Sequence, residues 1–168
     1  MKKVIIILIL LLFTVTCDRQ VKDNFYENGV EYITINNLPI VEALVNEKTC
    51  YFILDSGAST SVFNLTDVTK YGGRVVELEG SSIQGLGGTS ALKGAGGLLL
   101  EVGGVKLAAS FAAQDLSNVL RAIGKPGLVG VIGSDVFKRY GFILDYSTQT
   151  IYLSDFNTVV PNEPVTLN

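Results

Sequence analysis

A stretch of nine residues, Phe52 to Thr60 (FILDSGAST), constrains this chain most, because an apolar run of strand type ends there in an acid, a hydroxyl and a glycine. An ionised carboxylate at the end of a buried strand is costly to desolvate unless hydrogen bonds or charges compensate it. Ser56 and Gly57 can supply this compensation, because a hydroxyl and a glycine-permitted turn direct N–H groups at the carboxylate of Asp55. The stretch predicts a strand and turn in which Asp55 is either a capped structural acid or half of a catalytic pair.

The chain contains no histidine, and this limits the chemistry that it can perform. Ser-His-Asp and Cys-His catalysis within the chain are excluded, and a zinc enzyme site is not expected without this common ligand. We expect no metal and no cofactor, so any chemistry must use carboxylates, hydroxyls, Lys, Tyr or backbone groups. The formal charge of −3 provides no basic patch for nucleic acid. The 168 residues, 48% of them apolar and 17% charged, fit one folded domain.

The first residues predict a targeting segment rather than part of the fold. Lys2 and Lys3 precede an apolar run from Val4 to Val15, which is short for a membrane span but suits a signal peptide. Cys17 follows, and this order resembles a bacterial lipoprotein signal, in which the cysteine becomes the lipidated first residue. The expected location is the bacterial cell envelope, with a lipid anchor in the membrane; secretion, a periplasmic location or an uncleaved anchor are the alternatives. The expected segments are a signal peptide at residues 1–16 and a lipidated cysteine with its tether at residues 17–29.

Runs of β-branched and apolar residues, separated by turn signals such as Asn36-Asn37, predict an all-β fold with one or two short helices. Cys50 lies in one of these runs and is expected to be a small buried hydrophobe. Ser134 is expected to cap a helix that ends at Arg139. The residues Phe52 to Asp55 recur as Phe142 to Asp145, but no glycine follows the second copy, so Asp145 is expected to be a hairpin-turn acid. Strands are expected at residues 30–35, 39–45, 49–54, 142–146 and 150–153.

Glycine is concentrated in the middle of the sequence, where 11 of the 18 glycines lie between Gly72 and Gly104. Most of this region is expected to form β-hairpins interrupted by glycine. Ile83 to Thr89 is more specific, because a hairpin tip with almost no side chains can fold over a cleft and let a substrate backbone approach closely. Further on, Gly127 to Gly133 predicts a buried strand that another backbone approaches closely.

Several of these features occur together. An Asp-Ser-Gly triplet follows an apolar strand, Ala58-Ser59 comes directly after it, and Val131-Ile132-Gly133 precedes a short helix. With the glycine-rich hairpin between them, these motifs resemble the retropepsin-like (clan AA) aspartic proteases, the single-lobed relatives of pepsin. The resemblance covers about residues 30–154 in the order of the elements, and the expected protease domain is residues 30–155. It implies a single-lobe, closed β-barrel with a flap hairpin, and a tail at residues 156–168 that could add a strand to a dimer interface.

The resemblance also implies a role for each matching residue. Asp55 would be the catalytic acid, and Ser56 would form the hydroxyl hydrogen bonds that brace two such turns. Gly57 would allow the turn and offer its N–H to the carboxylate, and Ala58 would support the same turn. The strand that packs against the turn would contain Val131, Ile132 and Gly133. The flap would contain Gly85, Leu86, Gly87 and Gly88.

Peptide hydrolysis of this type uses two carboxylates that share one proton, one to deprotonate the attacking water and one to protonate the carbonyl. This chain has one complete Asp-Ser-Gly motif. The expected active form is therefore a symmetric homodimer, with one Asp55 from each subunit on the two-fold axis. The expected partners are a peptide or protein substrate, a second copy of the chain and, through Cys17, a membrane.

Two other functions fit the same residues. The domain could keep the fold but bind peptides without cleaving them, or it could be a structural β-domain of the envelope in which Asp55 only caps a turn. A dimer that brings the two Asp55 carboxylates together separates the peptidase from both alternatives. Viral members of the family usually have an acid where this chain has Ser59, so the resemblance does not define the substrate subsites.

Overall fold

The computed structural model describes residues 29–85 and 88–153. The predicted signal peptide, Cys17 with its tether, the tail from residue 156, and Leu86 and Gly87 of the predicted flap lie outside these residues. No helix in the described part of the chain is long and apolar enough to cross a membrane.

The all-β prediction is confirmed, because strands make up most of the described residues and the helices are short. The strands are β1 (Gly29–Ile35), β2 (Leu38–Val45), β3 (Lys48–Leu54), β4 (Val62–Asn64), β5 (Arg74–Gly85), β6 (Gly88–Gly96), β7 (Leu100–Val102), β8 (Val105–Leu107), β9 (Phe111–Gln114), β10 (Leu128–Ile132), β11 (Ile143–Asp145) and β12 (Thr150–Tyr152). The helices are the 3-10 turn η2 (Leu65–Asp67), α2 (Ser117–Ile123) and α3 (Ser134–Tyr140).

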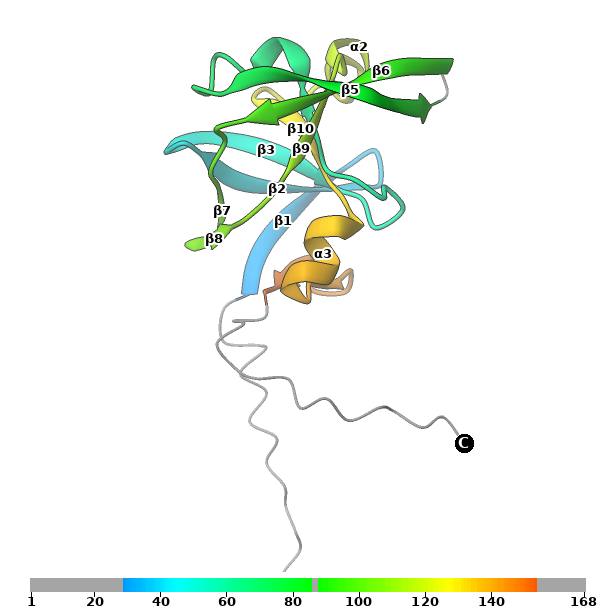
Figure 1. Cartoon of the computed structure of the whole chain (residues 1–168). Helices are drawn as coiled ribbons and strands as arrows, with labels where there is room; N and C mark the ends of the chain where they lie inside the picture. Colours follow the sequence, from blue (N-terminus) through cyan, green and yellow to red (C-terminus); the bar gives the residue numbers. More distant parts are fainter. Residues whose placement is uncertain (1–28, 86–87, 154–168) are drawn as a thin grey trace, which may run out of the picture.

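The strands form one sheet in the order β11-β12-β1-β2-β3-β10-β4-β9-β6-β5, with β7 paired to β2 and β8 to β7. The expectation of a closed barrel is wrong for the described residues, because β11 and β5 end this path and do not pair with each other. Figure 1 shows why: the β5–β6 hairpin lies at the top of the molecule, and the orange segment that contains β11 lies at the bottom. The two edges of the sheet are therefore too far apart to pair.

The second half of β3, Phe52 to Leu54, is buried on both faces, which explains why these residues form an unbroken apolar run. Phe52 is fully buried and packs with Phe63 of β4 and Phe111 of β9, with ring centroids 5.6–5.9 Å apart. Ile53 points the other way, into a smaller cluster that includes Leu120 of α2. These two clusters hold the strand that leads into Asp55 from both sides.

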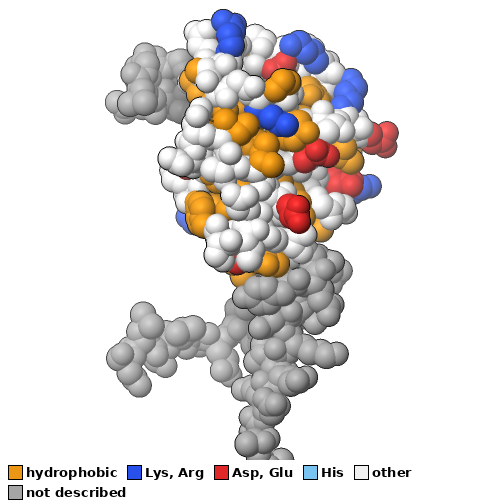
Figure 2. All heavy atoms as spheres, turned by 180° about the vertical axis from the view of Figure 1, so that it is seen from behind, with side chains coloured by type: hydrophobic (Ala, Val, Ile, Leu, Met, Phe, Trp, Pro, Cys, Tyr) orange, Lys and Arg blue, Asp and Glu red, His pale blue; other side chains and the backbone are white. Residues whose placement is uncertain are grey.

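The surface opposite to the view of Figure 1 has a mixed character. Figure 2 shows acidic and basic side chains interspersed on this face, with hydrophobic side chains between them.

Cys50 is fully buried, and burial raises the pKa of its thiol to about 12. The prediction of a small buried hydrophobe at this position is confirmed.

Asp145 is a hairpin-turn acid, as predicted. Its Oδ1 accepts hydrogen bonds from the hydroxyl and the backbone N–H of Ser147, at 2.7 and 2.8 Å, and from the Thr148 N–H at 3.3 Å. The bond from the Ser147 hydroxyl, followed by the other bonds, lowers the pKa of Asp145 below its ordinary value of 3.8. The two copies of Phe-Ile-Leu-Asp therefore end in different turns.

The pKa of Asp145 predicts a pH dependence of stability. A carboxylate whose pKa is lowered by folding stabilises the protein above its unfolded pKa, and this stabilisation is lost as the pH falls through the folded value. We expect Asp145→Asn to be less stable than the parent at pH 6, and the difference to narrow as the pH falls below 3.8. Urea unfolding at pH 6, 4 and 2.5 measures it. Ser147→Ala, which removes the first donor, should show part of the same change, whereas a difference independent of pH would contradict the assignment.

Candidate active site

The candidate active site is built where β3 ends and β4 begins, on either side of β10. β3 and β4 follow each other in the sequence, yet β10 lies between them, parallel to β3 and antiparallel to β4. The loop of residues 55–61 must therefore cross over the carboxyl end of β10 to connect them. This crossing places Ala58 and Thr60 of the loop against Gly133, the last residue of the predicted supporting segment Val131-Ile132-Gly133.

The turn at Asp55 has the geometry that its sequence predicts. The Gly57 N–H donates to Oδ1 of Asp55 at 2.8 Å, and the Ala58 N–H donates to the Asp55 carbonyl at 3.2 Å. The Asp55 N–H donates to the Ile132 carbonyl at 3.0 Å and so continues the pairing of β3 with β10. Asp55, Ser56 and Gly57 are all exposed, although Leu54 is buried. A rigid, buried strand thus presents one carboxylate to the outside.

Gly133 is required by this crossing because the loop backbone lies directly on it. A Cβ at this position would be 2.8 Å from the Ala58 carbonyl oxygen and 2.9 Å from the Thr60 carbonyl carbon. The Ser134 N–H donates to the same Ala58 oxygen at 2.7 Å. Ala58 thus contacts the residues after β10 through its carbonyl group rather than its side chain.

Ser61 and Asp135 also hold the loop, and the sequence did not point to either. Ser61 is completely buried; its hydroxyl donates to Oδ1 of Asp135 at 2.7 Å and accepts the Gly133 N–H at 2.9 Å. The prediction that Ser134 caps α3 is wrong, since the cap residue is Gly133 and no side chain caps the helix. Asp135, in the first turn of α3, instead accepts the hydrogen bond from Ser61 of the loop.

Ser61→Ala is expected to reduce the free energy of unfolding by roughly 1–3 kcal/mol, because it leaves the buried Gly133 N–H without an acceptor. Chemical denaturation of parent and variant measures the change. Ser59→Ala is the matched control: Ser59 is an exposed serine of the same loop, and its replacement should change stability by less than about 0.5 kcal/mol. Equal effects of the two substitutions would contradict the role of Ser61.

The predicted flap corresponds to the hairpin of β5 and β6. These strands pair antiparallel up to Gly85 and Gly88, which face each other at the outer end. Leu86 and Gly87 lie outside the described residues. In Figure 1 the outer end of this hairpin and the loop after β3 lie toward the same side of the molecule.

The chemistry available at this site is that of carboxylate and hydroxyl groups. Among residues 29–85 and 88–153, no three His, Cys, Asp or Glu side chains form a group that could hold a metal ion. One chain presents one exposed acid at this turn, next to the exposed hydroxyl of Ser56. An acid on a turn of Asp-Ser-Gly type, supported by a parallel strand that ends at Ile132 and is followed by Gly133, is the combination on which the resemblance to the retropepsin-like aspartic proteases rests.

Comparison with known proteins gives the same class. The profile of the family described as "Aspartyl protease" matches residues 41–136, which is more than half of the chain, and the chain belongs to this family. No curated protein matches the sequence.

Solved structures with a similar fold include two examples. The retroviral protease-like domain of Ddi1 from Leishmania major has a TM-score of 0.51 and 18% identity, covering 73% of this chain and 90% of that chain. EIAV protease complexed with the inhibitor HBY-793 has a TM-score of 0.47 and 22% identity, covering 64% of this chain and 93% of that chain. The likeness to the Leishmania major domain shows a shared retropepsin-like fold.

Proposed function

We propose that this protein is an aspartic endopeptidase that hydrolyses peptide bonds with a water activated by two Asp55 carboxylates, one from each subunit of a homodimer. The observation that carries the proposal is the Asp55 turn itself. A carboxylate is held at 2.8 Å from the Gly57 N–H at the end of a strand buried on both faces, yet the acid is exposed. The structural acid Asp145 accepts three hydrogen bonds within its own turn, whereas Asp55 accepts one and leaves most of its carboxylate available to a second group.

The proposed chemistry needs two carboxylates close together. Two like charges at short distance cannot both be ionised, so the pair shares one proton. The ionised carboxylate takes a proton from water, and the protonated one donates its proton to the carbonyl oxygen of the scissile bond. The two acids exchange these protonation states during the reaction, and no metal is needed.

A homodimer is proposed because one chain supplies only half of this pair. The Ser56 hydroxyl is exposed and makes no hydrogen bond to any residue in 29–85 or 88–153. On a two-fold axis it would donate to the neighbouring loop of the second subunit and brace the two turns. A lipid anchor at Cys17, in the bacterial envelope, would favour such a dimer by raising the local concentration of the chain.

The proposal is tested by incubating the full-length protein with a diverse peptide mixture at acid and neutral pH and identifying new termini by mass spectrometry. Cleavage by the parent that Asp55→Asn lacks supports the assignment. Peptides that are retained by both proteins but not cleaved would replace the peptidase by a peptide-binding module. Cleavage that is equal in parent and variant would reject Asp55 as the catalytic residue.

A further inference from the structure

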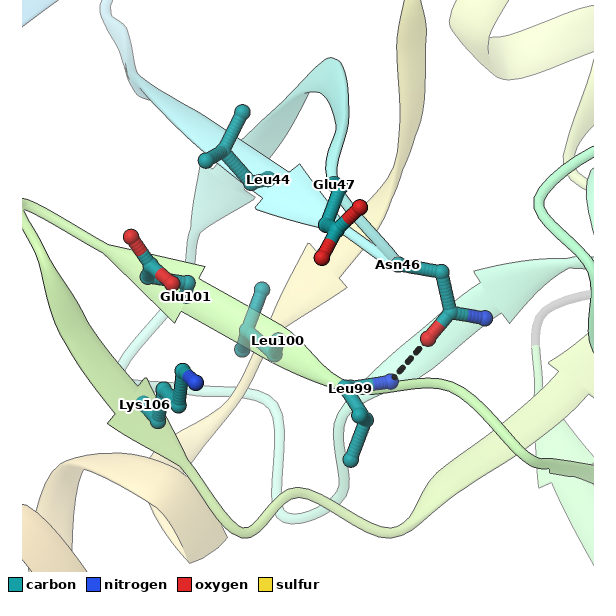
Figure 3. Close-up of a pocket in the computed structure, with 7 residues that line it drawn as sticks. All are labelled: Leu44, Asn46, Glu47, Leu99, Leu100, Glu101 and Lys106. Atoms are coloured by element: carbon teal, nitrogen blue, oxygen red, sulfur yellow. Dashed lines mark hydrogen bonds between the residues drawn. The ribbon is translucent and has the colours of Figure 1, made fainter.

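A second cluster of hydrogen bonds lies around the β2–β3 turn, at the end of β3 opposite to Asp55. β3 has seven residues, so about 20 Å separates this turn from the acid. The turn borders a hollow of about 340 Å³ whose wall includes Asn46 and Leu99 (Figure 3). The hollow is therefore separate from the Asp55 turn.

The side chain of Asn46 uses all of its hydrogen-bonding groups within this cluster. Its Nδ2 donates to the carbonyl oxygens of Tyr71 and Gly97, at 2.7 and 2.9 Å. Its Oδ1 accepts the Leu99 N–H at 3.0 Å, the bond drawn in Figure 3. The Asn46 N–H donates in turn to the Leu99 carbonyl at 3.0 Å. Reversing the amide would set its oxygen against two carbonyls, so these partners determine its orientation.

The partners of Asn46 lie at both ends of the β5–β6 hairpin. Tyr71 stands shortly before β5, which begins at Arg74, and Gly97 directly follows the last residue of β6. The two ends of the hairpin also touch each other, because a Cβ on Gly73 would lie 2.5 Å from Cδ2 of Leu98. One amide thus ties the base of the hairpin to the turn between β2 and β3.

The contacts at the base of the β5–β6 hairpin are important because the hairpin pairs with the rest of the sheet over only a few residues. β6 pairs with β9 only from Lys93 to Ala95. Farther out, from Ser82 to Gly85 and from Gly88 to Ala91, the two strands pair with each other and with no other described strand. The direction of this outer part is therefore set where the hairpin leaves the sheet.

The left-handed backbone of the turn does not by itself explain these bonds. Asn36 occupies the same place in the β1–β2 turn, with φ of 51° against 48° for Asn46. Both turns have positive φ at their two central residues, the geometry in which asparagine is favoured. The Asn36 side chain, however, is exposed and makes no hydrogen bond to the described residues. Of the two asparagines, only Asn46 makes the three side-chain hydrogen bonds.

We infer that Asn46 is a positioning residue that holds the base of the β5–β6 hairpin and so sets the place of the hairpin over the Asp55 turn. The effect on substrate rests on the proposed function, in which this hairpin covers a bound peptide. Without the amide, the hairpin would swing more freely, and a peptide would have to order it on binding. The peptide would then bind more weakly, while the carboxylates that perform the chemistry would be unchanged.

Amide hydrogen exchange on the full-length chain tests the positioning role without reference to activity. Asn46→Asp keeps the size of the side chain, and aspartate also accepts the left-handed backbone conformation. The substitution replaces the NH2 group, which donates two hydrogen bonds, by an oxygen that faces the same two carbonyl groups. We expect the Leu99 amide and the amides of β5 and β6 to exchange about tenfold faster, with β2 and β3 unchanged. Asn36→Asp, which adds the same charge in the sister turn, should alter neither group.

Two results would overturn the inference. One is that the amides of β5 and β6 exchange at the same rate in Asn46→Asp as in Asn36→Asp. The other is that Asn46→Asp speeds exchange in all strands, as expected of a residue that only stabilises the fold. If Asn46→Asp does not fold, the pair Asn46→Gly and Asn36→Gly decides instead, since glycine accepts the left-handed turn without strain.

Kinetics on a cleaved peptide complete the test. Asn46→Asp should raise KM about threefold or more and leave kcat within about twofold of the parent, the pattern of weakened binding. A change in kcat alone would overturn the positioning role. If the parent cleaves no peptide, the proposed function fails, and the exchange experiment still decides the role of Asn46.

Discussion

Asp55→Asn is expected to lower the rate of peptide hydrolysis by about a thousandfold or more, because it removes the group that takes and returns the proton of the attacking water. The fold should be unaffected. Asp55 is exposed, and the amide oxygen of asparagine can still accept the Gly57 N–H. Initial rates with a cleaved peptide, and unfolding curves of both proteins, measure the two parts of this prediction.

Asp145→Asn is the matched control, since this acid also follows Phe-Ile-Leu but lies in the β11–β12 turn. It should retain the activity of the parent at neutral pH. A fully active Asp55→Asn protein would remove Asp55 from the mechanism.

Mixing of subunits tests whether the two carboxylates belong to different chains. If parent and Asp55→Asn chains assort at random in equal amounts, only about a quarter of the dimers contain two intact acids. The activity of the mixture should therefore fall to about a quarter of that of the same total amount of parent protein. A fall to one half would show that each chain acts alone.

Gly130→Ala is expected to reduce the free energy of unfolding by about 3 kcal/mol or more, because this strand glycine has no room for a methyl group. A Cβ there would lie 2.1 Å from the Val62 carbonyl oxygen and 3.2 Å from the ring of Phe52. The first of these atoms belongs to the backbone of β4, which pairs with β10 at this point, so it cannot move aside like the end of a flexible side chain. The new methyl group would separate β10 from β4 and disturb the loop that crosses them.

Gly96→Ala provides the comparison, because it is also a strand glycine but its Cβ would be 3.4 Å from the nearest atom, a methyl group of Val76. Urea unfolding of the two variants should show a large loss for Gly130→Ala and at most a small change for Gly96→Ala. A Gly130→Ala protein as stable as the parent would show that β4 and β10 can separate without cost.

The sequence predicted those parts of the site that depend on neighbouring residues. Phe52 to Leu54 form a strand because they are apolar, and the turn after them follows from a hydroxyl and a glycine next to an acid. The hydrogen bond from Gly57 to Asp55 spans two residues, so it needs no other part of the chain. The supporting strand around Val131 was also predictable, because an apolar run interrupted by glycine indicates close approach of another backbone.

Other features depend on residues far apart in the chain and could not be predicted. Ser61 and Asp135 are 74 positions apart, and the polar run that contains Ser61 gives no sign that its hydroxyl is buried. Asn36 and Asn46 both precede a strand as turn residues, yet only the contacts of Tyr71, Gly97 and Leu99 with the second turn distinguish them. The sequence predicted a closed barrel instead of an open sheet for a similar reason: no local pattern indicates whether the two edge strands of a sheet pair with each other.

Sequence alone determined the chemistry that this chain can offer: no histidine, one complete Asp-Ser-Gly turn, and a strand apolar enough to be buried on both faces. Only the tertiary structure decided how the turn is held, because β10, from a distant part of the chain, enters between β3 and β4 and brings Gly133 under the loop. The physical reason is the range of the interactions. Turn conformation and apolar pattern are properties of a few consecutive residues, whereas burial of a hydroxyl or the direction of a hairpin depends on which distant backbone packs against it.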